Sequence, residues 1–265
     1  MEKVWEIIRK EWSEVFKNRF VFFAVAFMPI LFIAIPLGIL YSMRGSAGGS
    51  DISAAMTDLP QQMTAACEGL SATACSQYFL ISQFLILFLM MPVIIPVTIA
   101  SYSIVGEKTT RTLEPLLATP ISTMELLMGK ALAGVIPALG VTWLSYLVFV
   151  IGTYFLALEK SMVDAVLDPI WLTSIFGIGT LFSVAGVSLS IMISSRVNDP
   201  RVAEQLSSLV VLPVVGLMMG QSFGVIQYDL TLVLWTTLGM LALDAVLLYF
   251  AIQLFQRETI LTRWK

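Results

Sequence analysis

The sequence predicts an all-α integral membrane protein with six transmembrane helices, and three observations lead to this fold class. Of the 265 residues, 58% are hydrophobic and only 12% are charged, whereas soluble domains carry about 25% charged residues. Six long apolar runs lie between the charges, and each exceeds the roughly 20 residues that a helix needs to cross a bilayer. Backbone groups in lipid must be paired within their own segment, which favours helices over the short alternating strands of a β-barrel.

The charged residues set the bounds of the predicted elements. We expect a helix within residues 1–19 and a transmembrane domain over 20–265, with an outer loop at 44–77 and an inner loop at 106–125. The six spans are expected at about 20–43, 78–105, 131–157, 170–195, 205–227 and 231–255. Pro92 and Pro96 predict a kink in the second span, and Asp199 with Pro200 predicts a capped start just before the fifth.

The distribution of lysine and arginine predicts the orientation. Thirteen of the 15 basic residues lie before span 1, between spans 2 and 3, between spans 4 and 5, or after span 6. Basic residues accumulate on the cytoplasmic side of membrane proteins. Both termini are therefore expected in the cytoplasm.

The first 19 residues have an amphipathic pattern. Val4, Ile8, Trp12, Val15 and Phe16 recur at helical spacing, and charged residues occupy most of the other positions. This pattern predicts a helix lying in the cytoplasmic membrane interface with its aromatic side toward the lipid. The alternative is a solvated extension of span 1. The mixed charges at the N-terminus do not resemble a cleaved signal peptide.

The outer loop contains both cysteines of the chain, Cys67 and Cys75. Because the loop is predicted to face an oxidising compartment, the two thiols can form a disulfide. Two reduced cysteines are the alternative.

The inner loop, GEKTTRTLEPLLATPIST, contains two prolines that divide it. Pro115 fits the first turn of a new helix, and Pro120 biases the preceding residue away from helical geometry, so that helix can last only one or two turns. Ser122 and Glu125 then form an S-x-x-E capping box immediately before span 3. The loop is therefore expected to hold a short helix with exposed leucines.

The extended segment GEKTTRTLEPLLATPISTMELLMGK resembles the cytoplasmic segment of the permease subunits of type-2 ABC transporters, which are six-span exporters with a type V architecture. The matching positions are Glu107, Lys108, Thr112, Leu113, Glu114, Leu116, Leu117, Thr119, Pro120, Ile121, Ser122, Glu125, Leu126, Leu127, Gly129 and Lys130. The second inner loop, SSRVNDPRVAEQ, is similar to the sodium-efflux-like and multidrug export branch. The large outer domain often found in that branch has no counterpart in the outer loop at 44–77.

The resemblance implies that the inner loop is a coupling helix that docks into a groove on a separate ATPase subunit. Its residues would be Leu113, Leu116 and Leu117 in the groove, Glu107, Arg111 and Glu114 at the polar rim, and Pro120 at the helix end. Two ATPase subunits would carry ATP and Mg, so this chain itself would hold no cofactor. A second permease copy would complete the pore, as a homodimer or as a pair of unlike permeases, in a prokaryotic cell membrane, with lipid but no nucleic acid as a further partner.

The chain shows no sign of being an enzyme. It contains no histidine, which removes the commonest general base and metal ligand, and no metal site is predicted. A Walker A loop requires G-x-x-x-x-G-K-[ST]. Gly129 and Lys130 are followed by Ala131, and Met124 stands where the first glycine should be. ATP hydrolysis is therefore expected on another chain.

Two polar residues in the spans are candidates for the translocation path. Asp244 lies about midway along span 6 and Gln83 lies in span 2. A carboxylate within a membrane is costly, which favours a role in binding a cation or proton or in gating. The alternative for Asp244 is a structural contact with a hydroxyl on a neighbouring span, or a protonated acid.

Three functions are weighed against these features, and the first is favoured. The first is the permease subunit of an ABC exporter. The second is an ATP-independent secondary transporter that uses Asp244 with a cation gradient, which predicts inverted repeats that the sequence does not show. The third is an intramembrane enzyme, which requires paired acids or metal ligands within the spans. A drug-like or lipidic amphiphile, a cation and a peptide all remain candidate substrates.

Overall fold

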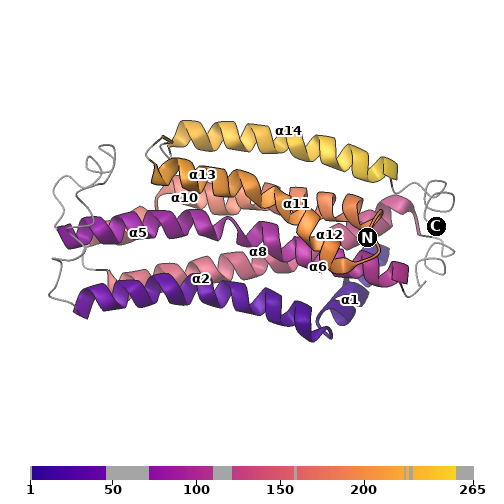
Figure 1. The fold of residues 1–265 in the computed structure, drawn as a ribbon, viewed down its shortest axis with the longest axis horizontal. Coiled ribbons are helices and arrows are strands. Elements are labelled where there is room, and N and C mark those ends of the chain that lie inside the picture. The colour runs from indigo at the N-terminus through magenta and orange to yellow at the C-terminus, as the bar shows by residue number, and fades with distance from the viewer. Residues whose placement is uncertain are drawn as a thin grey trace.

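The computed structural model describes residues 2–45, 72–109, 121–157, 160–223, 225–226 and 229–254. Within these ranges the regular structure is helical and contains no strand. Six helical segments are long and apolar enough to cross a membrane. The helices lie lengthwise in one elongated bundle (Figure 1), which confirms the predicted fold class.

The first three spans follow a short helix. This helix is α1 (Glu2–Val15), and span 1 is α2 (Arg19–Gly45). Span 2 consists of α5 (Ala72–Phe88) and α6 (Met91–Thr109), and span 3 is α8 (Thr123–Leu156).

The last three spans are less regular. Span 4 follows α9 (Lys160–Val166) and consists of α10 (Pro169–Thr173), the π-helical segment η2 (Ser174–Ile178) and α11 (Gly179–Ser194). Span 5 consists of α12 (Pro200–Ser207), the 3₁₀ segment η3 (Ser208–Val211) and α13 (Leu212–Ser222), and span 6 is α14 (Leu230–Leu254). Helical structure in span 5 thus begins five residues before the expected position 205, directly after Asp199, whose carboxylate accepts a hydrogen bond of 2.8 Å from the Arg201 amide.

Span 2 is interrupted at Leu89 and Met90, which form a turn between α5 and α6. Pro92 lies in the first turn of α6, where its missing N–H group costs no helical hydrogen bond. Pro96 lies inside α6. The kink predicted in this span is therefore confirmed, and it lies just before Pro92.

The centre of the bundle is the contact between α6 and α11. Small residues allow the two backbones to approach closely. A Cβ on Gly186 would lie 3.1 Å from a methyl carbon of Val97 and 3.2 Å from the Val93 carbonyl oxygen. The Ser101 and Ser190 hydroxyls, both fully buried, lie 2.9 Å apart in a hydrogen bond across the same contact. In contrast, α2, span 5 and α14 each bury less than a quarter of their apolar length, so their outer faces are available to lipid or to another chain.

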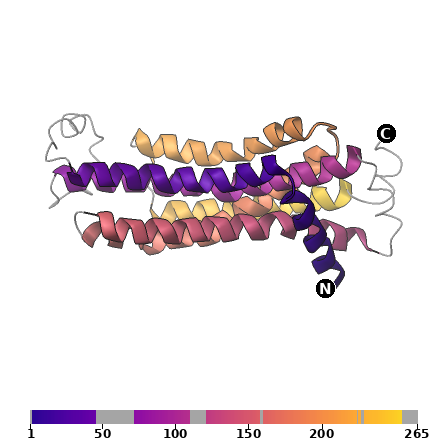
Figure 2. The same cartoon turned by 90° about the horizontal axis from the view of Figure 1, so that it is seen from below.

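The N-terminal helix and the last described turn of α14 lie at the same end of the bundle (Figure 1). At that end α1 crosses the bundle axis at an angle instead of continuing α2 (Figure 2). Its buried residues are Ile7, Ile8, Glu11 and Val15, and it packs mainly on α8. The helix therefore docks on the protein through one face, and its placement in a membrane interface stays a prediction.

Candidate functional site

The candidate site lies where α1 meets the end of α6 and the start of α8. These two helices are connected by the inner loop, whose residues 110–120 lie outside the described ranges. Several predicted coupling residues fall in that segment, namely Arg111, Leu113, Glu114, Leu116, Leu117 and Pro120. Glu107 and Lys130, which flank the loop, are both described and buried.

Lys130 forms the centre of a buried ion cluster. Its ammonium lies 2.8 Å from a carboxylate oxygen of Glu11 and 2.7 Å from one of Glu107. It also donates a hydrogen bond of 2.9 Å to the Ser103 hydroxyl, and that hydroxyl donates to Glu11. Lys10 approaches the other oxygen of Glu107 at 2.5 Å. We call these five residues the loop-end cluster.

The cluster balances its charges. Two lysines face two glutamates: the Lys130 ammonium donates hydrogen bonds to Glu11 and Ser103 and forms an ion pair with Glu107, which also pairs with Lys10. The side chains of Lys130, Glu11 and Glu107 are each at most 3% exposed. Buried charges are tolerated when they are paired and hydrogen-bonded in this way. The cluster thus holds α1 to both ends of the loop at once.

The surroundings shift the pKa values of two of these groups, Glu11 and Lys10, away from their ordinary values. Burial raises the pKa of Glu11, but the charge and hydrogen bond of Lys130 and the Ser103 hydroxyl lower it by more, so the pKa is lower than usual. Burial lowers the pKa of Lys10, but its hydrogen bond and charge interaction with Glu107 raise it by more, so the pKa is higher than usual. Both shifts favour the charged forms that hold the cluster together.

A second contact between α1 and α8 forms at a backbone carbonyl that a proline leaves without its helical hydrogen-bond donor. Pro137 lies inside α8 and has no N–H group for the carbonyl of Ala133, four residues earlier. The Trp12 indole N–H donates to that carbonyl oxygen at 3.0 Å. One turn away, a Cβ on Gly129 would lie 2.7 Å from the Ile7 side chain. Glycine at this position therefore allows α1 to lie directly against α8.

The predicted capping box at the start of α8 is formed. The Ser122 hydroxyl accepts a hydrogen bond from the Glu125 amide at 3.2 Å, and the Glu125 carboxylate accepts one from the Ser122 amide at 2.8 Å. These hydrogen bonds lower the pKa of Glu125. The end of the loop on the α8 side thus has a fixed geometry.

Glu107 occupies a different place from the one expected. The resemblance predicted that it would lie at the polar rim of the ATPase contact, but its carboxylate is 3% exposed and faces Lys10 and Lys130. Sequence reasoning also did not assign a role to Glu11 or Lys10. The helical periodicity of α1 separates its charged residues from its apolar ones, but it contains no signal that Glu11 is buried against α6 and α8.

The family of the chain follows from its similarity to known proteins. A family model described as ABC-2 family transporter protein matches residues 5–237, which is most of the chain. The chain belongs to the ABC-2 transporter family. The comparison with curated proteins gave no match. An ABC-2 permease is a membrane component of an ABC transporter and associates with an ABC ATPase. The match does not distinguish the sodium-efflux-like branch.

Within this ABC-2 permease, Asp244 lies on the buried stripe of α14. The stripe also contains Val233, Met240, Leu247 and Ala251, and α14 packs mainly on α11. The Asp244 side chain is 5% exposed, and neither of its oxygens has a hydrogen-bond partner among the described residues. No lysine or arginine lies within any of the six predicted spans. Among the described residues, none forms an ion pair with Asp244.

Gln83 lies in α5, where its side-chain oxygen accepts a hydrogen bond of 3.2 Å from Ser222 at the end of α13. No hydrogen bond between described residues joins it to Asp244. The two path candidates are therefore held by different pairs of helices.

Cys75 is buried near the start of α5 and is disulfide-bonded. Cys67 lies outside the described residues, so that its part in the predicted pair stays a prediction.

Proposed function

We propose that this ABC-2 permease is the membrane subunit of an ATP-driven exporter. Two copies assemble with two ATPase subunits, which carry ATP and Mg, in a prokaryotic cell membrane. The inner loop docks on the ATPase, with Leu113, Leu116 and Leu117 in its groove and Arg111 and Glu114 at the rim. Family membership supports an ABC ATPase partner, and the resemblance of the loop supports its docking role.

The observation that carries the proposal is the loop-end cluster. A loop that receives force from a partner must be attached to the spans that move. Glu107 lies in the last turn of α6 before the loop, Lys130 lies in α8 after the loop, and both side chains meet at one buried point on α1. Because α1 leads directly into α2, a push on the loop reaches spans 1, 2 and 3 together. Glu107 therefore acts in coupling as an anchor of the loop.

The docking role is tested by two substitutions in the loop, Leu116→Asp and Leu117→Asp. The permease is co-expressed with its partner ABC ATPase, and co-purification and ATP hydrolysis by the complex are measured. We expect both variants to lose the ATPase, because a carboxylate is costly in an apolar groove. Leu167→Asp, an exposed leucine in the connection between α9 and α10, is the matched control. Variants that assemble and hydrolyse ATP like the wild type would show that the loop is not the docking element.

Asp244 is proposed to lie on the translocation path and to bind a cationic group. A buried carboxylate with no hydrogen-bond partner among the described residues favours either a proton or a cation from outside the chain. Binding of tetraphenylphosphonium to the purified transporter tests this role. We expect Asp244→Asn to weaken binding at least tenfold, and Asp164→Asn, at an exposed acid in α9, to leave it unchanged. Equal binding by both variants, or no binding by the wild type, contradicts the assignment.

The buried carboxylate of Asp244 also favours a second candidate function, an ATP-independent secondary transporter. Transport into sealed vesicles separates the two. The exporter requires ATP on the side of the ATPase, whereas a secondary transporter works with a cation gradient in the absence of ATP. Gradient-driven transport by the permease alone would overturn the proposed function.

A further inference from the structure

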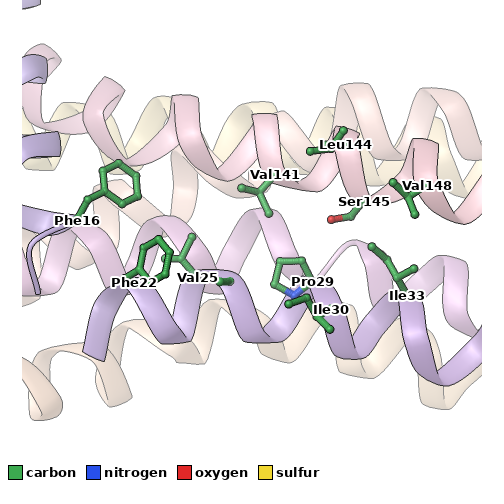
Figure 3. A pocket seen from close by; sticks show the side chains of 11 residues that line it. Phe16, Phe22, Val25, Pro29, Ile30, Ile33, Val141, Leu144, Ser145 and Val148 are labelled. Carbon is green, nitrogen blue, oxygen red and sulfur yellow. The ribbon is translucent and has the colours of Figure 1, made fainter. Parts of the chain in front are cut away.

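A groove opens between α2 and α8 on the outside of the bundle. Its volume is about 340 Å³, within the range of roughly 300–1,000 Å³ that is usual for ligand pockets. The side chains of α2 and α8 face each other across it, and Phe16 lies at one end (Figure 3). Apart from Ser145, every residue that lines it is apolar. Ile30 and Leu144 are 60% and 63% exposed, so the groove is open to the surrounding membrane.

The shape of the groove follows from how the two helices diverge. Toward the far end of α2 they touch, since a Cβ on Gly152 would lie 2.5 Å from the Leu37 side chain. Toward α1 they separate, and the space between them is lined from Phe22 to Ile33 on α2. The 11 residue steps from Phe22 to Ile33 correspond to about 17 Å of helix at 1.5 Å per residue. One leaflet of a bilayer has a hydrocarbon depth of about 15 Å.

The position of the groove within span 1 also matches one leaflet. The apolar span runs from Val21 to Met43, and the groove covers the half nearer to α1. An acyl chain of a lipid in that leaflet therefore lies parallel to the groove and has about its length. A peptide would place unpaired backbone groups against an apolar wall, which is costly in hydrocarbon.

Two basic residues lie at the end of the groove where a lipid headgroup would be. Arg19 begins α2 and shares a face with the lining residue Phe22, three positions later. Lys17 directly follows Phe16 in the turn before α2. Both basic side chains are exposed, and neither forms a salt bridge or hydrogen bond with a described residue. A phosphate in the headgroup layer has the complementary charge.

We propose that the groove between α2 and α8 is a binding site for one anionic phospholipid, with an acyl chain along Phe22–Ile33 and the phosphate at Lys17 and Arg19. This lipid fills the space between spans 1 and 3 near the junction of α1 and α2. The site is separate from the inner loop and from Asp244, so it does not depend on the proposed function.

The test compares lipid retention by the purified full-length permease in nanodiscs that contain equal amounts of phosphatidylglycerol and phosphatidylcholine. Retained lipid is counted by native mass spectrometry after release into detergent. Lys17→Gln and Arg19→Gln should each lower the preference for phosphatidylglycerol about fivefold, the effect of one basic residue near an anionic surface. Arg9→Gln with Arg196→Gln is the matched control, because it removes two exposed charges at positions outside the groove lining.

A second variant tests the acyl-chain part. Ala26→Phe places a large side chain in the groove and should abolish retention of either lipid, while Lys17→Gln and Arg19→Gln should lower only the preference for phosphatidylglycerol. The two charge substitutions lie at the surface and leave the groove lining intact. Their effect on headgroup preference can therefore be measured even if Ala26→Phe does not fold. Retention without headgroup preference in the wild type, or a preference that the control lowers equally, overturns the proposal. A change in the dimer fraction with Ala26→Phe and no retained lipid would instead assign the groove to contact with a second copy.

Discussion

Lys130→Met is the most direct perturbation of the loop-end cluster. The variant keeps the length of the side chain but removes the ammonium that lies within 2.8 Å of Glu11 and 2.7 Å of Glu107. Both carboxylates are then buried at 2% and 3% exposure, and among the described residues only Lys10 remains to compensate them. Removal of one partner from a buried ion pair costs about 3–5 kcal/mol. We expect a loss of this size in the free energy that holds α1 on α6 and α8.

Hydrogen exchange of the α1 amides, read by mass spectrometry, measures that free energy locally. A loss of about 3 kcal/mol corresponds to opening that is more than about 100-fold more frequent. Lys10→Met is the comparison variant: its side chain is 37% exposed, and its partner Glu107 keeps the ion pair with Lys130 when Lys10 is replaced, so the loss should be smaller than in Lys130→Met. Addition of Glu11→Gln to Lys130→Met should restore much of the protection, since it removes the carboxylate left without its partner. Exchange in Lys130→Met that is no faster than in Lys10→Met would refute the role of the cluster.

Three further predictions concern the same helix and use the same exchange measurement. The lowered pKa of Glu11 and the raised pKa of Lys10 predict protection that is constant between their ordinary values of 4.5 and 10.5. Protection of the α1 amides should fall as the pH drops below 4.5, where Glu11 takes up a proton, and as it rises above 10.5, where Lys10 loses one. Glu11→Gln should abolish the change at acidic pH. Gly129→Ala should cost about 1–3 kcal/mol, because its Cβ would meet Ile7 at 2.7 Å, and unchanged exchange would disprove this close contact. Trp12→Phe removes the indole donor and should cost about 1–3 kcal/mol, whereas protection equal to the wild type would show that water replaces it.

Much of the fold could be predicted because the signals are local. Apolar length predicts the spans, the S-x-x-E pattern predicts the start of α8 at Thr123, and Pro92 predicts the break in span 2. Each of these depends on residues that are neighbours in the chain. The π-helical segment Ser174–Ile178 was not predicted, since its serine, glycine and apolar residues have no pattern that distinguishes them from an α-helix.

The candidate site could be predicted only in part, because its contacts are not local. The resemblance located the loop, but Glu11 and Lys130 are 119 positions apart, and no periodicity reports such a pair. The Trp12 contact depends on a carbonyl that Pro137 leaves without a donor in another helix. Glu107 was expected to face a partner because the sequence shows its charge, whereas its burial depends on where α1 docks.

The separation of Glu11 and Lys130 also has a consequence for the synthesis of the chain. Translation proceeds at roughly 5–20 residues per second, so the 119 positions between them take about 6–24 s. During this interval α1 has emerged, but the helix that neutralises its buried glutamate does not yet exist. The N-terminal helix must therefore wait, with Glu11 hydrated, until span 3 is inserted. Its docking therefore follows the insertion of span 3, although the helix itself is made before spans 1, 2 and 3.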